Sequence, residues 1–349
     1  MDRSDDEFTV NETLKKALQA AFKLPLVRRA ALARLRDRAT VVMYHGVVPD
    51  SSPYDAWTLL PASQFQAQLE FIREHFTPVT IDQVLNPPTD LRKPALAVTF
   101  DDGLRNNLAT ALPLLESYEI PATVYVSTRA IEAQELFWWD RITLALQHSR
   151  ATELDLSASG LGIQHFANAP ARKRWEDIER LLSVIKQDGY AERESVATQI
   201  AEMFLSPAEM QVDEFSILTV DELRELAASE LITIGSHTHS HELLPRLSLE
   251  EARQDIEQAI EKLENWLGIE ILHFAYPGGD HTTELVELVR AMRVDTAVTI
   301  VERRVDRGAD PLAIPRFGMG GYDATLEWQA NLIGLTELKA RFSGGAAQG

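Results

Sequence analysis

Residues 95–103, ALAVTFDDG, decide the fold class that the sequence predicts. Six apolar or β-branched residues are followed directly by two acids and a glycine, which is typical of a buried strand that ends in a turn. Comparable short apolar runs occupy residues 40–44, 122–126, 231–235, 273–276, 295–301 and 312–317. Segments with apolar residues at helical spacing stand between several of them, at 65–76, 104–118, 220–228 and 248–267. This alternation of strands and helices predicts a parallel sheet with helices packed outside it.

The helix expected at 248–267 has the clearest boundaries. It opens with Ser248, has Glu251 three residues later and is followed by Gly268. A serine followed by a glutamate at this spacing forms a capping box, and a glycine commonly closes a helix. We therefore expect this helix to begin and end at these residues.

The 349 residues fit one α/β barrel with additions, since such barrels commonly have about 250 residues. Residues 141–218 interrupt the alternation, because their composition is mostly helical and they contain no clear strand. We interpret them as a helical insertion in a barrel that spans residues 39–340. A basic helical extension, 1–38, would precede the barrel, and a disordered tail, 341–349, would follow it.

Composition excludes several classes of protein. The chain has no cysteine, which rules out disulfides and cysteine-ligated metal sites. Its net charge of −19 argues against nucleic acid as a partner, because phosphate recognition needs basic surfaces. No apolar run approaches the roughly 20 residues that cross a bilayer.

The N-terminal region predicts a cytoplasmic protein. The sequence MDRSDDEFTV is acidic and is not followed by the apolar run of a secretory signal. Residues 13–38 then hold eight basic residues and one acid. This segment would either make weak contact with an anionic membrane surface or form an amphipathic helix with its basic face in water; the second is the commoner case.

Two motifs that follow predicted strands carry the candidate chemistry. Asp101 and Asp102 follow the strand at 95–100, and three histidines, at 237, 239 and 241, follow the strand at 231–235. The carboxyl ends of parallel strands lie at one end of an α/β fold, where active sites form. One carboxylate and two imidazoles would make an open divalent-metal site, for which Zn²⁺ is the first choice and Co²⁺, Ni²⁺, Mn²⁺ or Fe²⁺ are alternatives.

Together these motifs resemble the polysaccharide deacetylase family, also called carbohydrate esterase family 4. The resemblance rests on TFDDG at 99–103 and HTHSH at 237–241, with VVMYHGV at 41–47, PATVYVS at 121–127, FWWDR at 137–141 and FAYPGG at 274–279. It covers roughly residues 40–130 and 218–320. It implies a distorted (β/α) barrel of about seven parallel strands. It also implies a metal-dependent hydrolase that removes N-acetyl groups from a sugar or polysaccharide.

The resemblance also implies a role for individual residues. Asp101 would be the general base, and the metal ligands would be Asp102, His237 and His241. The backbone N–H of Tyr276 would lie near the developing oxyanion and the substrate.

The sequence departs from the family pattern at two positions. Many members have an arginine that orients the base where this chain has Ala275; Arg316 would replace it, or would be a surface or ion-pairing residue. Many members also have a late histidine that protonates the leaving amine, but no histidine follows His281. His45 is the candidate donor, because it follows the strand at 40–44; the alternative is a structural histidine.

The remaining candidates are weaker. Trp138 and Trp139 would stack on a sugar ring or pack at a junction. His239 and His281 are lesser catalytic candidates, and His75, His148, His165 and His273 are expected to be structural or exposed. Two further functions stay open: hydrolysis of another linear amide, such as an N-formyl or N-acyl metabolite, and carbohydrate binding without turnover. The sequence does not indicate the oligomeric state.

Overall fold

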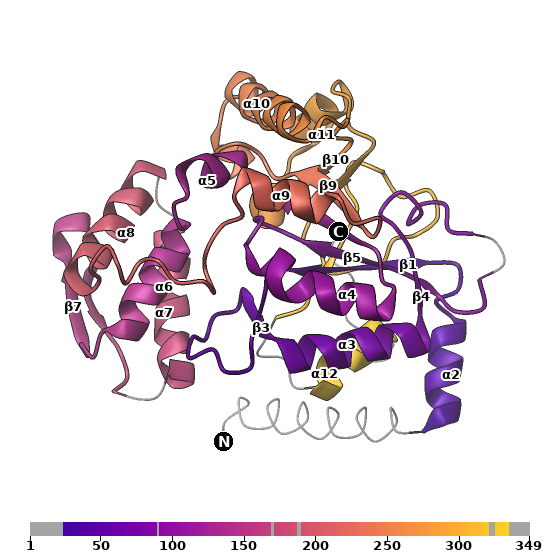
Figure 1. Cartoon of the computed structure of the whole chain (residues 1–349), viewed down its shortest axis with the longest axis horizontal. Coiled ribbons are helices and arrows are strands. Elements are labelled where there is room, and N and C mark those ends of the chain that lie inside the picture. The colour runs from indigo at the N-terminus through magenta and orange to yellow at the C-terminus, as the bar shows by residue number, and fades with distance from the viewer. Residues whose placement is uncertain (1–23, 89–90, 169–170, 187–189, 321–324, 335–349) are drawn as a thin grey trace, which may run out of the picture.

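The computed structural model describes residues 24–88, 91–168, 171–186, 190–320 and 325–334. Its centre is a curled parallel sheet with the strand order β11-β10-β9-β6-β5-β1-β12, with β4 beside β5 (Figure 1). The strands are β1 (Ala39–Tyr44), β4 (Thr77–Pro78), β5 (Ala95–Phe100), β6 (Ala122–Val126), β9 (Ile232–Ser236), β10 (His273–Ala275), β11 (Thr296–Val298) and β12 (Phe317–Gly318). The predicted barrel of about seven parallel strands is therefore confirmed.

A short late segment joins the two edges of this sheet. Ile314 bridges Val298 of β11 in parallel, and Phe317 and Gly318 of β12 pair with β1. The N–H of Thr299 donates to the Ile314 carbonyl at 2.8 Å. The strands expected at 295–301 and 312–317 are therefore shorter in the structure, as β11 and β12. The joining segment pairs with each edge of the sheet over only one or two residues.

The strands of the sheet centre are covered on both faces. Every residue of β1, β5 and β6 is buried, as expected for parallel strands with helices outside. The covering helices are α3 (Ala62–His75), α4 (Leu112–Tyr118), α9 (Val220–Ala227), α10 (Leu249–Leu267), α11 (Thr283–Arg290) and α12 (Thr325–Leu332). Figure 1 shows α3, α4 and α12 on one side and α10 and α11 on the other.

The ends of α10 follow from its sequence. The Ser248 hydroxyl accepts the N–H of Glu251, and the Glu251 carboxylate accepts the N–H of Ser248 at 2.8 Å. Gly268 closes the helix with a φ of 70°. The predicted capping box and glycine stop are confirmed.

Between β6 and β9 the chain forms a lobe beside the barrel (Figure 1). It contains α6 (Trp138–His148), α7 (Ala171–Ile185) and α8 (Tyr190–Phe204), whereas α5 (Thr128–Ala133), directly after β6, packs into the barrel core through Ala130 and Ile131. The expectation that this region lacks strands is wrong, because β7 (Glu153–Leu156) pairs antiparallel with β8 (Gly162–His165). Only Leu154 and Leu156 of β7 face inward, so the run is too short and too polar to be recognised as a strand. The lobe has its own core, which includes Ile142, Leu146, Trp175, Ile178 and Ile200.

The end of the predicted basic extension is helical. Helix α2 (Pro25–Ala33) begins at a proline, which is favoured in the first turn because its missing N–H needs no partner there. Residues 1–23 and the tail at 341–349 lie outside the described residues. In the part of the chain that is described, no helix has both the length and the apolarity needed to cross a membrane.

Candidate active site

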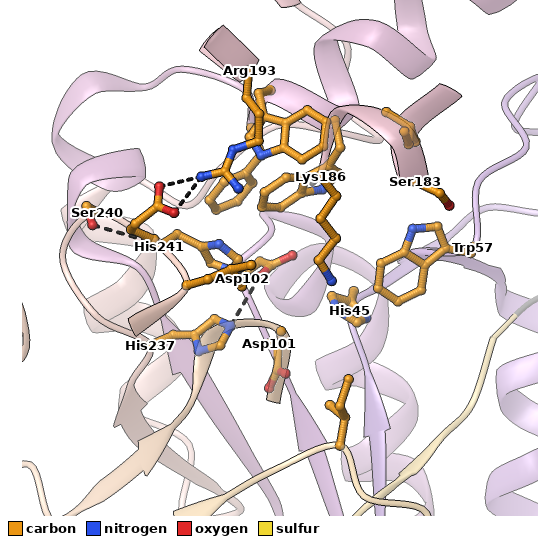
Figure 2. A pocket seen from close by; sticks show the side chains of 18 of the residues that line it. His45, Trp57, Asp101, Asp102, Ser183, Lys186, Arg193, His237, Ser240 and His241 are labelled. Atoms are coloured by element: carbon orange, nitrogen blue, oxygen red, sulfur yellow. Dashed lines mark hydrogen bonds and ion pairs between the residues drawn. The ribbon is translucent and has the colours of Figure 1, made fainter. Parts of the chain in front are cut away.

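The carboxyl ends of the barrel strands surround a pocket of about 360 Å³. His45 follows β1, Asp101 and Asp102 follow β5, and His237 follows β9. All four line the pocket, together with His241 (Figure 2). The parallel topology therefore brings together side chains that are separated by up to about 200 positions in the sequence.

Asp102, His237 and His241 form a cluster suited to a metal ion. One ligand atom from each of the three side chains lies within 4.8 Å of the others. The Nε2 atoms of His241 and His237 are 3.2 Å and 3.6 Å from Asp102 Oδ1. Asp102 Oδ1 is buried and has no hydrogen-bond partner among the described residues. A cation between these atoms would satisfy it, so the residues present fit a divalent metal.

The protonation states of these side chains also fit metal ligation. His237 Nδ1 lies 2.8 Å from the Ala275 carbonyl, so Nδ1 carries the proton and Nε2 presents its lone pair to Asp102. Burial lowers the pKa of His237 to about 4, which keeps the ring neutral. Burial opposes ionisation of Asp102, but His241 and His45 outweigh burial and hold the pKa of Asp102 below the usual range.

The backbone is strained at two of the three candidate ligands. Asp102 has a φ of 76° and His241 a φ of 59°, and Thr238 between the histidines has a φ of 64°. Non-glycine residues in this region cost about 1–3 kcal/mol each and persist where the surroundings enforce them. The N–H of His241 donates to Thr238 Oγ1 at 3.0 Å, which fixes the turn that carries the second histidine.

Arg316 lies directly behind Asp101. Its two terminal nitrogens bind the two carboxylate oxygens of Asp101, each at 2.7 Å. Its Nε donates to the Thr299 carbonyl at 2.9 Å and its Nη1 to Thr99 Oγ1 at 3.1 Å. Burial alone would raise the pKa of Asp101, but the Arg316 guanidinium outweighs it and holds that pKa below the usual range. Of the two expectations for Arg316, a surface position is wrong, because the side chain is fully buried.

The predicted oxyanion role of Tyr276 is wrong. Its backbone N–H donates to the Val298 carbonyl at 3.2 Å. The N–H that was expected to bind the oxyanion is therefore engaged within the sheet. Its side chain is fully buried, and the hydroxyl donates to the Leu312 carbonyl at 3.1 Å. Gly278, two residues later, lines the pocket instead, with a φ of 63°.

His45 lines the pocket beside an aromatic residue that the sequence analysis missed. The Trp57 ring meets the His45 ring edge-on at 4.5 Å between centroids. Trp57 is 40% exposed at the pocket, unlike the core aromatics. The Asn107 amide donates to the His45 carbonyl at 2.6 Å, which fixes the backbone that carries the imidazole. Trp57 stands alone in an irregular segment, so no periodicity in the sequence distinguishes it.

Both predicted stacking residues line the pocket, but they also pack against protein rings. Trp139 stacks on Phe137 at 4.6 Å and lies 4.9 Å from the His241 ring. Trp138 meets Trp139 edge-on, and the Arg193 guanidinium lies 5.9 Å from the centre of the Trp138 ring. Their contact with substrate stays a prediction.

One helix of the lobe forms a wall of the pocket that the sequence analysis did not assign. Helix α7 contributes residues at helical spacing, ending with Ser183; Lys186, just beyond the helix, extends its amine into the pocket (Figure 2). The pocket-lining residues of α7 itself are Glu179, Leu182 and Ser183. This side of the pocket therefore belongs to the lobe and not to the barrel.

The other histidines lie elsewhere. His239 Nδ1 is 2.9 Å from Thr128 Oγ1, and His281 Nδ1 is 3.0 Å from the Gly279 carbonyl. Neither is among the residues that line the pocket. The four histidines expected to be structural or exposed are also absent from that lining: His75, His148, His165 and His273.

Comparisons with known proteins agree with this geometry. The sequence profile of the polysaccharide deacetylase family matches residues 89–297. No curated protein sequence matches the chain.

Solved structures establish the fold at low sequence identity. The Streptococcus pyogenes deacetylase PplD in complex with acetate has 15% identity and a TM-score of 0.54, over 85% of this chain and 96% of that one. IcaB from Ammonifex degensii has 18% identity and a TM-score of 0.53, over 85% and 97%. BC0361, a polysaccharide deacetylase from Bacillus cereus, has 16% identity and a TM-score of 0.52, over 84% and 69%. With the profile match over most of the barrel, the chain belongs to the polysaccharide deacetylase family.

Proposed function

We propose that the protein is a divalent-metal-dependent hydrolase that removes N-acetyl groups from an N-acetylated carbohydrate. The observation that carries this proposal is that Asp101, held from behind by Arg316, lines one pocket together with the cluster of Asp102, His237 and His241. A module that only bound sugar would need neither a ligand set nor a paired carboxylate beside it.

The residues around the pocket divide the chemistry among them. Asp102, His237 and His241 would hold the metal, with Zn²⁺ as the first choice for this ligand set. Bound there, the ion would polarise the amide carbonyl and acidify water.

Asp101 would accept the proton of the attacking water. Arg316 occupies one site on each of its two oxygens, and an ionised carboxylate offers about four acceptor sites, so proton acceptance remains open to it. Since the pKa of Asp101 is held low, this carboxylate is ionised over the whole neutral range.

His45 would donate a proton to the leaving nitrogen. The water oxygen bonds to the acyl carbon, the C–N bond breaks, and the proton allows the nitrogen to leave as an amine, with acetate as the other product. His45 supports this role because it lines the same pocket from the neighbouring strand β1.

The proposal is tested by acetate release from N-acetylated chitooligosaccharides. The chelator-treated protein should be inactive and should recover when Zn²⁺ or Co²⁺ is added. The double variant His237→Ala/His241→Ala should bind no metal, because one carboxylate is too small a ligand set for a stable site. Metal binding without release of acetate from any acetylated sugar would favour another linear amide as substrate or a binding role.

A further inference from the structure

The lobe between β6 and β9 touches the candidate metal site through a buried ion pair. Glu242 immediately follows the ligand His241, and Arg193 belongs to the first turn of α8. Arg193 Nη2 lies 2.5 Å from each carboxylate oxygen of Glu242 (Figure 2). Arg193 is 3% exposed and Glu242 is 5% exposed, so water screens neither charge.

The two ends of the histidine loop are held by different parts of the fold. The first part is tied to the barrel: the Thr238 and His239 carbonyls accept backbone N–H groups of α5 at 3.3 Å and 3.0 Å. The N–H of Ser240 donates to Asp255 of α10 at 3.0 Å. His237 is fixed by its 2.8 Å contact with the Ala275 carbonyl.

The second part of the loop is held by the lobe. The His241 ring lies 4.9 Å from Trp139 at the start of α6 and 5.1 Å from Phe137 just before it. The residue after it is held by Arg193 of α8. His241 itself has a left-handed backbone, which relaxes unless its surroundings enforce it.

We propose that Arg193 is a positioning residue for the metal site, which acts by fixing Glu242 and thereby the Nε2 atom of His241. This inference rests on the proposed function. Groups behind a metal ligand orient it, and their loss typically weakens metal binding by about 10- to 100-fold. Without the guanidinium, the Glu242 carboxylate would be buried without its partner and would turn toward water, moving the adjacent His241.

The test compares Arg193→Met with a matched variant in the same lobe. Arg141 of α6 pairs with Glu194 of α8 and donates to Thr198 Oγ1 at 3.2 Å. Arg141→Met therefore removes an ion pair between α6 and α8 without removing a contact of the histidine loop. Zn²⁺ affinity is measured by competition with a chelator, and folding by circular dichroism and thermal unfolding of the metal-free protein.

Arg193→Met should bind Zn²⁺ about 10- to 100-fold more weakly than the wild type, and Arg141→Met should stay within about 3-fold. Saturating Zn²⁺ should restore most of kcat to Arg193→Met, with KM unchanged. Arg193→Lys, which keeps the charge, should lie between the wild type and Arg193→Met.

Equal Zn²⁺ affinity in Arg193→Met and the wild type would overturn the inference, and so would an equal loss in Arg141→Met. If Arg193→Met does not fold, Zn²⁺ affinity is measured in Glu242→Gln, which removes the other charge of the pair. A wild-type Zn²⁺ affinity in that variant would also overturn the inference. A wild type that binds neither Zn²⁺ nor Co²⁺ would instead refute the proposed function and this inference together.

Discussion

Arg316 and Asp101 are 215 positions apart in the sequence, yet the guanidinium of one binds both carboxylate oxygens of the other at 2.7 Å. Asp101 comes from the end of β5, and Arg316 from the segment that joins the sheet edges. The pair therefore couples the candidate base to the completed barrel. It also reverses the effect of burial on that base.

Replacing Arg316 by methionine should move the acid limb of the pH profile to higher pH. Burial raises the pKa of Asp101 and Arg316 lowers it, so without the guanidinium the pKa rises. The carboxylate is then protonated, and inactive as a base, up to a pH about 1–3 units higher. The measurement is kcat/KM against pH with saturating metal. An acid limb at the wild-type pH in this variant would contradict the role of Arg316.

Exchanging each aspartate for asparagine should separate their roles. Asp101→Asn should retain the metal and lose about 10²- to 10⁴-fold in turnover, the usual contribution of a general base. Asp102→Asn should lose both metal and turnover, because it removes one of three ligands. Metal content and kcat are measured for both variants. Loss of metal in Asp101→Asn but not in Asp102→Asn would show that Asp101 is the ligand and Asp102 the base.

His45→Ala should lower kcat without changing the metal content. A proton donor is needed only when the C–N bond breaks, so its loss should slow turnover and leave metal binding unchanged. His281→Ala is the matched control, because His281 follows β10 of the same sheet but is not among the pocket-lining residues. A wild-type kcat in His45→Ala would eliminate His45 as the donor.

Trp57→Ala should raise KM more than it lowers kcat. An aromatic contact contributes about 0.5–1.5 kcal/mol, which corresponds to a change of about 2- to 12-fold in KM. Trp57→Phe, which keeps a flat ring, should stay close to the wild type. Initial rates over a range of oligosaccharide concentrations give both constants. An unchanged KM in Trp57→Ala would show that substrate does not contact this ring.

The candidate metal ligands and base could be predicted because the sequence patterns that indicate them lie within a few neighbouring residues. Asp101, Asp102, His237 and His241 each stand within a few residues of a short apolar run that became a barrel strand. Parallel topology then puts the ends of such strands at one end of the barrel. The capped helix α10 was equally predictable, since Ser248 and Gly268 mark its ends within the sequence itself.

Other features could not be predicted, because they depend on pairing between distant segments. The prediction for Tyr276 was wrong because β10 pairs with β11, and this pairing engages the backbone N–H of Tyr276. No residue pattern in the sequence indicates that pairing. The sequence also showed no sign of Trp57 and Lys186, which lie in irregular segments. It did not reveal the Arg193–Glu242 pair either, because helical periodicity shows which face of a helix is buried but not which residues that face contacts. The hairpin of β7 and β8 was missed for a related reason, since two inward leucines are too few to show a period of two.

The segment that joins the sheet edges is also the last part of the candidate site to be synthesised. A chain emerging from the ribosome contains every candidate metal ligand once residue 241 has been made, but Arg316 follows 75 residues later. Until Arg316 is in place, Asp101 lacks the cation that holds it ionised once the barrel encloses it. A chain that ends before residue 316 would therefore contain all the candidate metal ligands but lack the partner of the candidate base.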